Sequence, residues 1–127
     1  MEVLLDTNFI IACLKKKISI EEKLNEIIKD KVEIVLLNLV KKELENFKNK
    51  KNKRLEDKNL VEVFLKMLKE NCISTKIKEV NQKNPDEALK VYCDKNPSCV
   101  LATLDKELRK KVKNRLITIK GKSFSFV

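Results

Sequence analysis

The side chains in this sequence that are best suited to chemistry are carboxylates, because the chain contains no histidine. Without histidine, neither a Ser-His-Asp nor a Cys-His catalytic arrangement can form, and no histidine can bind zinc. The only glycine is Gly121, so the sequence also lacks the glycine-rich loop of a P-loop or a dinucleotide-binding fold. Any catalysis must therefore use carboxylates, lysine, cysteine or tyrosine.

Two aspartates follow apolar segments that have the composition of buried strands. Asp6 comes directly after Val3–Leu5, and Asp105 follows residues 99–102. Ligand sites in open parallel sheets lie beyond the carboxyl ends of the strands, so we expect both side chains at that edge. A single aspartate in such a position is more often a turn or cap residue. Two of them after strands of one sheet indicate a shared site.

A glutamate at the edge of a helical stripe is the third candidate. Val40, Leu44 and Phe47 have the spacing of the buried face of a helix. Glu43 lies three steps after Val40, which places it about 60° from that residue at about 100° per step. Glu45 points almost the opposite way, into solvent. We therefore expect Glu43 to enter a site between this helix and the sheet, and Glu45 to be an ordinary surface charge.

The fourth candidate, Asp86, lies in the first turn of a predicted helix. Asn84 is a good N-cap residue, Pro85 suits the first helical position, and Glu87 completes a capping box. Asp86 precedes the apolar Leu89 by three residues and so lies towards the same face. Asp86 is therefore available for a site, whereas Glu87 is explained by capping.

Four carboxylates that converge on one edge repel one another, and each contact raises the pKa of at least one of them. Divalent cations supply the missing positive charge, and all-oxygen ligands suit Mg²⁺ or Mn²⁺ better than zinc. Such a metal activates water and stabilises the charge that builds up during an in-line displacement at phosphorus. The acidic residues therefore favour the chemistry of a nuclease.

The remaining charge is strongly basic. The chain has 29 Lys and Arg against 19 Asp and Glu, a net charge of +10, which favours a polyanionic partner and above all nucleic acid. No basic amphipathic helix with exposed aromatic residues is evident, which disfavours a membrane partner. The simpler alternative is that the basic stretch 48–54 is a solvated loop that serves only solubility. We expect this stretch to bind RNA through five residues: Lys48, Lys50, Lys51, Lys53 and Arg54.

Strand-like and helix-like segments alternate along the chain. Apolar or alternating segments predict strands at residues 3–5, 32–37, 73–77, 99–102 and 116–119. Amphipathic spacing predicts helices at 9–14, 20–28, 40–47, 60–68 and 106–112, another that starts at Asn84, and a cap at Asn38. The Phe124 and Phe126 tail is expected to add an edge strand or to pack on a partner. The alternation predicts an α/β fold, a three-layer α/β/α sandwich with a central mostly parallel sheet, in one domain over residues 1–127.

The cysteines and the apolar segments bear on the cellular compartment. Cys13, Cys72, Cys93 and Cys99 form no Cys-x-x-Cys pair, so we expect no structural zinc site. Free thiols are the default in the cytosol, but the Lys- and Ile-rich composition hints at a heat-adapted source, which leaves disulfides open. No apolar run approaches the roughly 18 residues that span a bilayer, and the N-terminus does not resemble a signal peptide. We therefore expect a cytoplasmic protein.

Four segments together resemble the motifs of the PIN-domain family. The opening Val3-Leu4-Leu5-Asp6-Thr7-Asn8 is similar to the family's hydrophobic-Asp-Thr-Asn start, and residues 40–45 resemble its Val-x-x-Glu-Leu helix. Residues 85–89 look like its Asp-x-x-Ile helix start, and residues 101–108 are similar to its Thr-x-Asp-x-Glu-Leu signature. Each motif is weak alone, but all four occur in the family's order across nearly the whole chain.

The resemblance implies a ribonuclease that uses Mg²⁺ or Mn²⁺. It implies that Asn8 and Thr103 orient carboxylates through hydrogen bonds. The chain looks most like archaeal stand-alone PIN proteins, which sit near VapC-type toxins and ribosomal-RNA processing nucleases. RNA is then the expected substrate, with a cognate antitoxin or a ribosome-assembly factor and a second copy of the chain as partners. The catalytic residues and metal ligands implied by the resemblance are Asp6, Glu43, Asp86 and Asp105.

Two departures and two alternatives accompany the resemblance. Leu89 stands where Ile is usual, and no additional Asp accompanies Asp105, which leaves open whether one or two metals bind. A non-catalytic PIN module that binds RNA or a ribosome-assembly partner is the main alternative. A receiver domain is also a small parallel α/β fold, but it needs an acid after its third strand, where this chain has Asn81 and Gln82.

Overall fold

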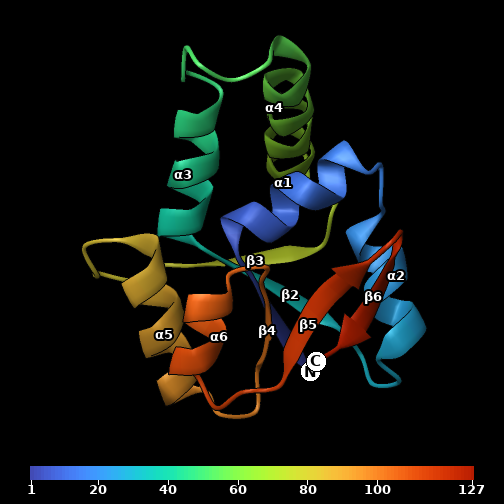
Figure 1. The fold of residues 1–127 in the computed structure, drawn as a ribbon, viewed down its shortest axis with the longest axis vertical. Helices are drawn as coiled ribbons and strands as arrows, with labels where there is room; N and C mark the ends of the chain where they lie inside the picture. Colours follow the sequence, from blue (N-terminus) through green and yellow to red (C-terminus); the bar gives the residue numbers. More distant parts are fainter.

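A six-stranded sheet forms the centre of the computed structural model, which describes all residues from 1 to 127 (Figure 1). Neighbouring strands are parallel from β3 to β5, and β6 runs antiparallel to β5, in the order β3-β2-β1-β4-β5-β6. This mostly parallel sheet, flanked by helices, confirms the predicted α/β fold. The strands are β1 (Glu2–Leu5), β2 (Glu33–Leu37), β3 (Thr75–Lys78), β4 (Val100–Ala102), β5 (Leu116–Lys120) and β6 (Ser123–Phe126).

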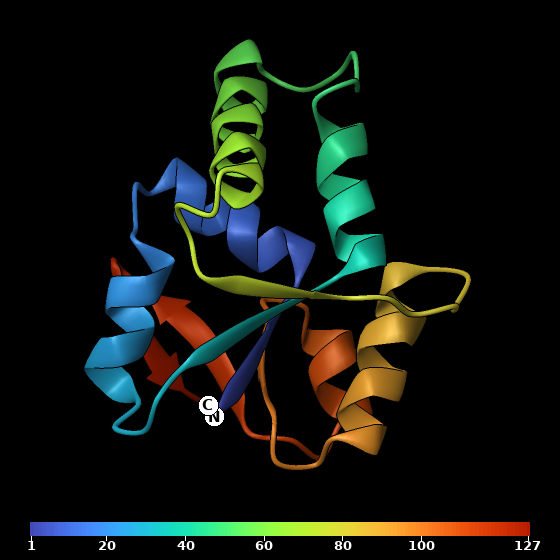
Figure 2. The same cartoon turned by 180° about the vertical axis from the view of Figure 1, so that it is seen from behind.

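Six helices surround the sheet. Helices α3 and α4 stand side by side at one end of the molecule and both contact α1, whereas α5 packs with α6 and α2 packs against β6 (Figures 1 and 2). None of them is long and apolar enough to cross a membrane. They are α1 (Thr7–Lys15), α2 (Ile20–Ile27), α3 (Asn38–Phe47), α4 (Leu55–Lys69), α5 (Pro85–Lys95) and α6 (Lys106–Lys111).

The central strands are apolar because both of their faces are covered. Val3–Leu5 of β1, Ile34–Leu37 of β2 and all of β4 are buried. The edge strand β3 instead has the alternating sequence Thr-Lys-Ile-Lys, and three of its four residues are exposed. At the other edge, β6 turns Phe124 inward, where its ring centroid lies 5.0 Å from that of Phe9. The C-terminal tail therefore adds an edge strand, one of its two predicted roles.

The register of β1 aligns the carboxyl ends of neighbouring strands. β1 lies between β2 and β4, with Leu4 paired to Val35 on one side and to Leu101 on the other. The residues that follow β1 and β4, Asp6 and Thr103, therefore emerge at the same edge of the sheet. This edge is where an open parallel sheet forms ligand sites.

The start of α1 differs slightly from the prediction. The helix begins at Thr7 rather than at Phe9. Asp6 has the extended backbone of an N-cap residue, and its carbonyl already accepts a hydrogen bond from the Ile10 N–H at 3.1 Å. Asp6 therefore joins the end of β1 directly to the first turn of α1.

The predicted cap at Asn38 is wrong. Leu37 occupies the N-cap position of α3, and the Asn38 side chain bonds to a distant loop instead. Its Oδ1 accepts from the Val80 N–H at 2.9 Å, and its Nδ2 donates to the Val80 carbonyl at 3.3 Å. Asn84, by contrast, caps α5 as predicted, accepting from the Glu87 N–H at 2.9 Å. Asn38 thus ties the segment between β3 and α5 to the start of α3.

Asn38→Ala should lower the free energy of unfolding, because it leaves both backbone polar groups of Val80 without their partner. Unsatisfied groups of this kind cost about 1–3 kcal/mol. Asn46→Ala is the matched control, since Asn46 is exposed on the same helix. Urea unfolding compares the parent with the two variants. Equal stabilities for both variants would show that the Asn38–Val80 pair contributes nothing.

Candidate metal centre

Asp6 lies at the centre of the candidate site. It is only 4% exposed, and its backbone N–H donates to the Ala102 carbonyl at 3.0 Å. Its carbonyl accepts the first backbone hydrogen bond of α1, so Asp6 is held in place by β1, β4 and α1 together. Its position therefore follows from the packing of the core.

Thr103 connects two of the predicted ligands. The residue is fully buried, and its hydroxyl donates to Asp6 Oδ2 at 2.6 Å. Thr103 Oγ1 also accepts a hydrogen bond from the Asp105 N–H at 3.0 Å. Because the single hydroxyl proton is used on Asp6, the lone pairs remain for the Asp105 amide. Thr103 thus holds both acids against the end of β4.

Asp105 also serves as the N-cap of α6. Its Oδ1 accepts hydrogen bonds from the Glu107 N–H at 2.9 Å and from the Leu108 N–H at 3.2 Å. Oδ2 receives no hydrogen bond. One carboxylate oxygen therefore fixes the side chain on the helix and the other remains free to bind a cation, so capping and ligation are compatible.

Glu43 and Asp86 reach the electrostatic environment of Asp6 from α3 and α5. Burial is the largest influence on Asp6 and raises its pKa above the ordinary value. The Thr103 hydroxyl and the Thr7 backbone N–H lower this pKa because they stabilise the ionised form. The negative charges of Asp86 and Glu43 raise it further. The structure therefore brings both Glu43 and Asp86 within electrostatic reach of Asp6.

The helical phase predicted for α3 separates two glutamates. Glu43 is half-buried and influences Asp6, whereas Glu45 is exposed. Glu45 lines a different groove, between α3 and α4, together with Lys41 and Lys66. Asp86 is itself exposed and lines, with Asp105, a cleft of about 390 Å³ between α5 and α6. The four predicted acids are therefore related in pairs. Glu43 and Asp86 act electrostatically on Asp6. Thr103 joins Asp6 to Asp105 through hydrogen bonds, and Asp86 and Asp105 line the same cleft.

No basic side chain forms an ion pair with this acidic group, although Lys90 and Lys111 line the same cleft as Asp86 and Asp105. The protein forms six ion pairs, and none of them involves the four acids, although the chain carries 29 Lys and Arg. A buried carboxylate without a partner is costly to ionise. The electrostatics of the site therefore favour an external cation.

The donor set fits a hydrated Mg²⁺ or Mn²⁺ ion. No three acidic or cysteine side chains come close enough to enclose an ion by themselves. Mg²⁺ commonly keeps several of its waters and takes only one or two carboxylates, so a loosely spaced set of oxygen donors suits it. A fully desolvated zinc site, by contrast, would need four converging ligands. The four cysteines are free thiols, three of them buried.

Two further polar residues near Asp6 differ in their contacts. Asn8, predicted to orient a carboxylate, is exposed and makes no hydrogen bond to any of the four acids. Arg109 was not anticipated from the sequence: its Nη2 donates to the Thr103 carbonyl at 3.1 Å and to Thr118 Oγ1 at 2.8 Å. The only sequence signal for Arg109 is its place one helical turn after Asp105. Arg109 therefore braces the strand end that carries Thr103.

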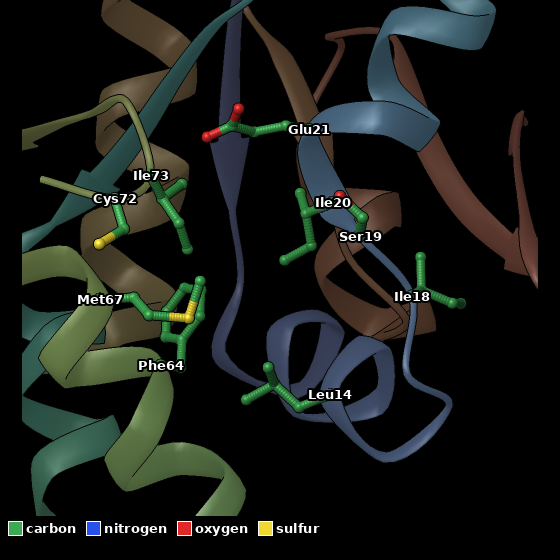
Figure 3. Close-up of a pocket in the computed structure, with 9 residues that line it drawn as sticks. All are labelled: Leu14, Ile18, Ser19, Ile20, Glu21, Phe64, Met67, Cys72 and Ile73. Carbon is green, nitrogen blue, oxygen red and sulfur yellow. The ribbon is translucent and has the colours of Figure 1, made fainter.

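An apolar cavity of about 270 Å³ lies elsewhere, between α1, α2 and α4 (Figure 3). Leu14, Ile20, Phe64 and Met67 point into it, and Glu21 lies at its rim. None of the four candidate acids lines this cavity, and its walls offer no group of polar side chains for catalysis. The acidic centre is the better candidate for chemistry.

Comparison with known families decides the assignment. The profile of the family described as "PIN like domain" matches residues 3–121. The chain belongs to the PIN-domain family. This PIN-domain protein is 31% identical over 114 residues to Ribonuclease VapC4 of Methanocaldococcus jannaschii, which covers 90% of this chain and 84% of the relative.

Solved structures show the same fold. The PIN domain endonuclease Utp24 superposes with a TM-score of 0.78 at 20% identity, covering 98% of this chain and 90% of that chain. A chain from the crystal structure of VapBC2 from Rickettsia felis gives a TM-score of 0.57 at 15% identity. In that structure VapBC2 is bound to a DNA fragment from its promoter. That match covers 94% of this chain and 100% of the other. The PIN-domain fold predicted from the motifs is therefore confirmed.

Asp6→Asn should stabilise the metal-free PIN domain at neutral pH. Because the folded-state pKa of Asp6 is raised, protonated Asp6 contributes stability below the unfolded-state pKa of about 3.9. That contribution is lost as the pH rises through the folded-state pKa. Asn stays neutral and keeps a carbonyl oxygen for Thr103. The measurement is chemical unfolding of both proteins in the presence of chelator, from acidic to neutral pH. If the extra stability of the variant does not grow with pH, the pKa of Asp6 is not raised in the folded protein.

Proposed function

We propose that this PIN-domain protein is a divalent-metal-dependent endoribonuclease that hydrolyses phosphodiester bonds of RNA. The observation that carries the proposal is the group of acids without a basic partner around the buried Asp6. A chain with a net charge of +10 that leaves this group without an ion pair has the electrostatics of a metal site inside a polyanion-binding surface. The name of the relative Ribonuclease VapC4 supports the ribonuclease activity.

The protein residues divide the work of hydrolysis. Bound at this centre, Mg²⁺ or Mn²⁺ supplies Lewis acidity and an activated water. Thr103 keeps the Asp6 carboxylate oriented and favours its ionised form. The N-terminal amides of α6 fix Asp105, and the exposed Asp86 faces the side open to substrate. The proposed ligands are Asp6, Glu43, Asp86 and Asp105.

The α3–α4 loop, residues 48–54, is proposed to bind the RNA backbone. All seven residues are exposed. The loop begins five residues after Glu43, about 7.5 Å further along α3, at the end of the helix that points away from the sheet (Figure 1). Arg54 pairs with Glu56 at 3.4 Å, but both side chains are more than 70% exposed, and such a pair contributes little. The loop therefore keeps its charge available for phosphates.

Two cellular roles fit this activity. One is a VapC-type toxin controlled by a cognate antitoxin, and the other is ribosomal-RNA processing with a ribosome-assembly factor. The names of the relatives, VapC4 and VapBC2, favour the first. We propose that the protein acts in the cytoplasm as a homodimer. A neighbouring gene for a small DNA-binding antitoxin would decide between the roles.

A non-catalytic PIN module that binds RNA or a ribosome-assembly partner is the alternative function. One observation favours it: no three acidic side chains are arranged to hold an ion by themselves. The two functions differ in a simple property, because only the nuclease requires a divalent cation. Metal binding and cleavage therefore discriminate between them.

Cleavage of single-stranded or loop RNA should require Mn²⁺ or Mg²⁺ and stop when a chelator is added. Asp6→Asn should lower the rate by more than the roughly 10–100-fold that loss of an orienting partner costs. Asp30→Asn is the control, because Asp30 is an exposed acid in the turn before β2. Gel analysis of end-labelled RNA measures all three rates. Cleavage that continues at the same rate in EDTA would contradict the metal-dependent mechanism.

Glu43 rather than Glu45 should bind the metal. The two glutamates share a helix and a charge, so Glu43→Gln and Glu45→Gln form a matched pair. Glu43→Gln should weaken Mn²⁺ binding by about tenfold or more, whereas Glu45→Gln should leave it unchanged. Calorimetric titration of Mn²⁺ into each variant gives the dissociation constants. Loss of affinity only in the Glu45 variant contradicts the proposed ligand set.

A further inference from the structure

A second group of lysines gathers where the end of α1 meets the β5–β6 hairpin. Lys16 and Lys17 follow α1, and Lys120 and Lys122 flank Gly121 at the hairpin turn. The two segments are 105 positions apart, yet Lys16 Nζ donates to the Gly121 carbonyl at 3.1 Å. Figure 1 shows the α1–α2 connection beside this hairpin. We call these four residues, Lys16, Lys17, Lys120 and Lys122, the α1–hairpin surface.

The charge of this surface is not neutralised by the protein. All four lysines are exposed, and none forms an ion pair. Residues 14–20 and 115–127 contain no acid at all. The neighbouring Lys15 is paired with Asp57, at 3.5 Å, so it is left out of the surface. Four unpaired positive charges on two adjoining turns form a concentrated site for a polyanion.

The backbone at Lys17 adds an independent observation. The Lys17 N–H donates to the Leu14 carbonyl and the Ile18 N–H to the Cys13 carbonyl, which is the hydrogen-bond pattern of a Schellman motif. Lys17 therefore occupies the left-handed position of that motif, with φ 57°, where glycine is usually found. The side chain is kept at a position where its presence strains the backbone. A lysine that is kept at a strained position suggests that its positive charge contributes to function.

The surface lies on the same edge of the sheet as the acids. β5 runs parallel to β4, so Lys120 emerges at the carboxyl edge. β5 is the second strand from β1, which puts the hairpin about 10 Å from the line of β1 at about 4.8 Å per strand. The α3–α4 loop lies at the end of α3 that points away from the sheet (Figure 1). The two basic segments therefore lie in different directions from the acidic centre.

We propose that the α1–hairpin surface is a second RNA-binding arm, which holds backbone phosphates at a place separate from the α3–α4 loop. The choice of RNA among polyanions rests on the proposed function. A strand long enough to contact both arms is held at two separate points on the surface around the acidic centre. Each arm then raises the effective concentration of the strand at the other.

The test measures binding of labelled single-stranded RNA by fluorescence anisotropy across a salt series, with chelator present to prevent cleavage. The arm variant carries Lys16→Ser, Lys17→Gly, Lys120→Ser and Lys122→Ser. The matched control removes four exposed, unpaired lysines remote from the acids by Lys29→Ser, Lys31→Ser, Lys95→Ser and Lys113→Ser. Both variants lose the same net charge. A third variant replaces the five basic residues of the α3–α4 loop by Ser.

The arm variant should bind RNA at least tenfold more weakly at low salt than the control. Each lost phosphate contact lowers the slope of log affinity against log salt by about 0.7 on a single strand, so four contacts predict a loss of roughly 2 to 3 units. The loop variant should show a comparable loss, and the combined variant should lose more than either. Lys17→Gly alone should flatten the slope while raising the unfolding midpoint, which separates lost charge from lost folding.

Equal affinities and slopes for the arm and control variants would overturn the proposal. It would also be overturned if the arm variant lost only binding to vesicles of anionic phospholipid, with its RNA slope unchanged. The result is independent of catalysis. A parent that binds RNA through both arms but does not cleave it with Mn²⁺ refutes the nuclease and leaves the arm standing, whereas a cleaving protein whose arm variant binds like the control refutes the arm alone.

Discussion

The pairing of β1 with β4 is the constraint on which the candidate site depends. Backbone and side chain act together there: the Asp6 N–H bonds to the Ala102 carbonyl, and the Asp6 carboxylate accepts from Thr103. A slip of one residue would separate the Asp6 N–H from the Ala102 carbonyl and the Asp6 carboxylate from Thr103, so the position of the acid depends on this register. The acid is thereby positioned by the hydrophobic core rather than by a loop. Helix α6 is joined to the same arrangement, because Asp105 caps it and Arg109 donates a hydrogen bond to the Thr103 carbonyl.

The charges of the molecule are segregated against the tendency of opposite charges to pair. Lysines are abundant on the surface, yet none forms an ion pair with the acids around Asp6. Burial makes ionised Asp6 unfavourable in the empty fold, and that cost is the kind of local conflict found at functional sites. An electronegative centre within a positive surface attracts a polyanion broadly and admits cations locally. Neither property follows from the net charge alone.

The features predictable from the sequence are those encoded by local pattern. The apolar runs of β1, β2 and β4 have one stable environment, the middle of a covered sheet, and the spacing around Val40 sets the phase that separates Glu43 from Glu45. The start of α4 was missed because Leu55, its first residue, is 72% exposed and adds nothing to the apolar pattern. Asn38 was misread because its partner, Val80, lies 42 positions away. The bonds of Arg109 and the meeting of α1 with the hairpin likewise depend on packing that no local window contains.

The distance along the chain between the halves of the acidic centre has a consequence for synthesis. Asp6 and Thr103 are 97 positions apart, and Phe9 of the first helix packs on Phe124 of the last strand. On a ribosome, β1 and α1 emerge first, but the strand and the hydroxyl that complete their environment emerge last. The nascent chain therefore cannot assemble the centre until nearly all of it has been translated. For the ribonuclease that we propose, such an order of folding withholds activity until the residues around Thr103 and Phe124 have also been made.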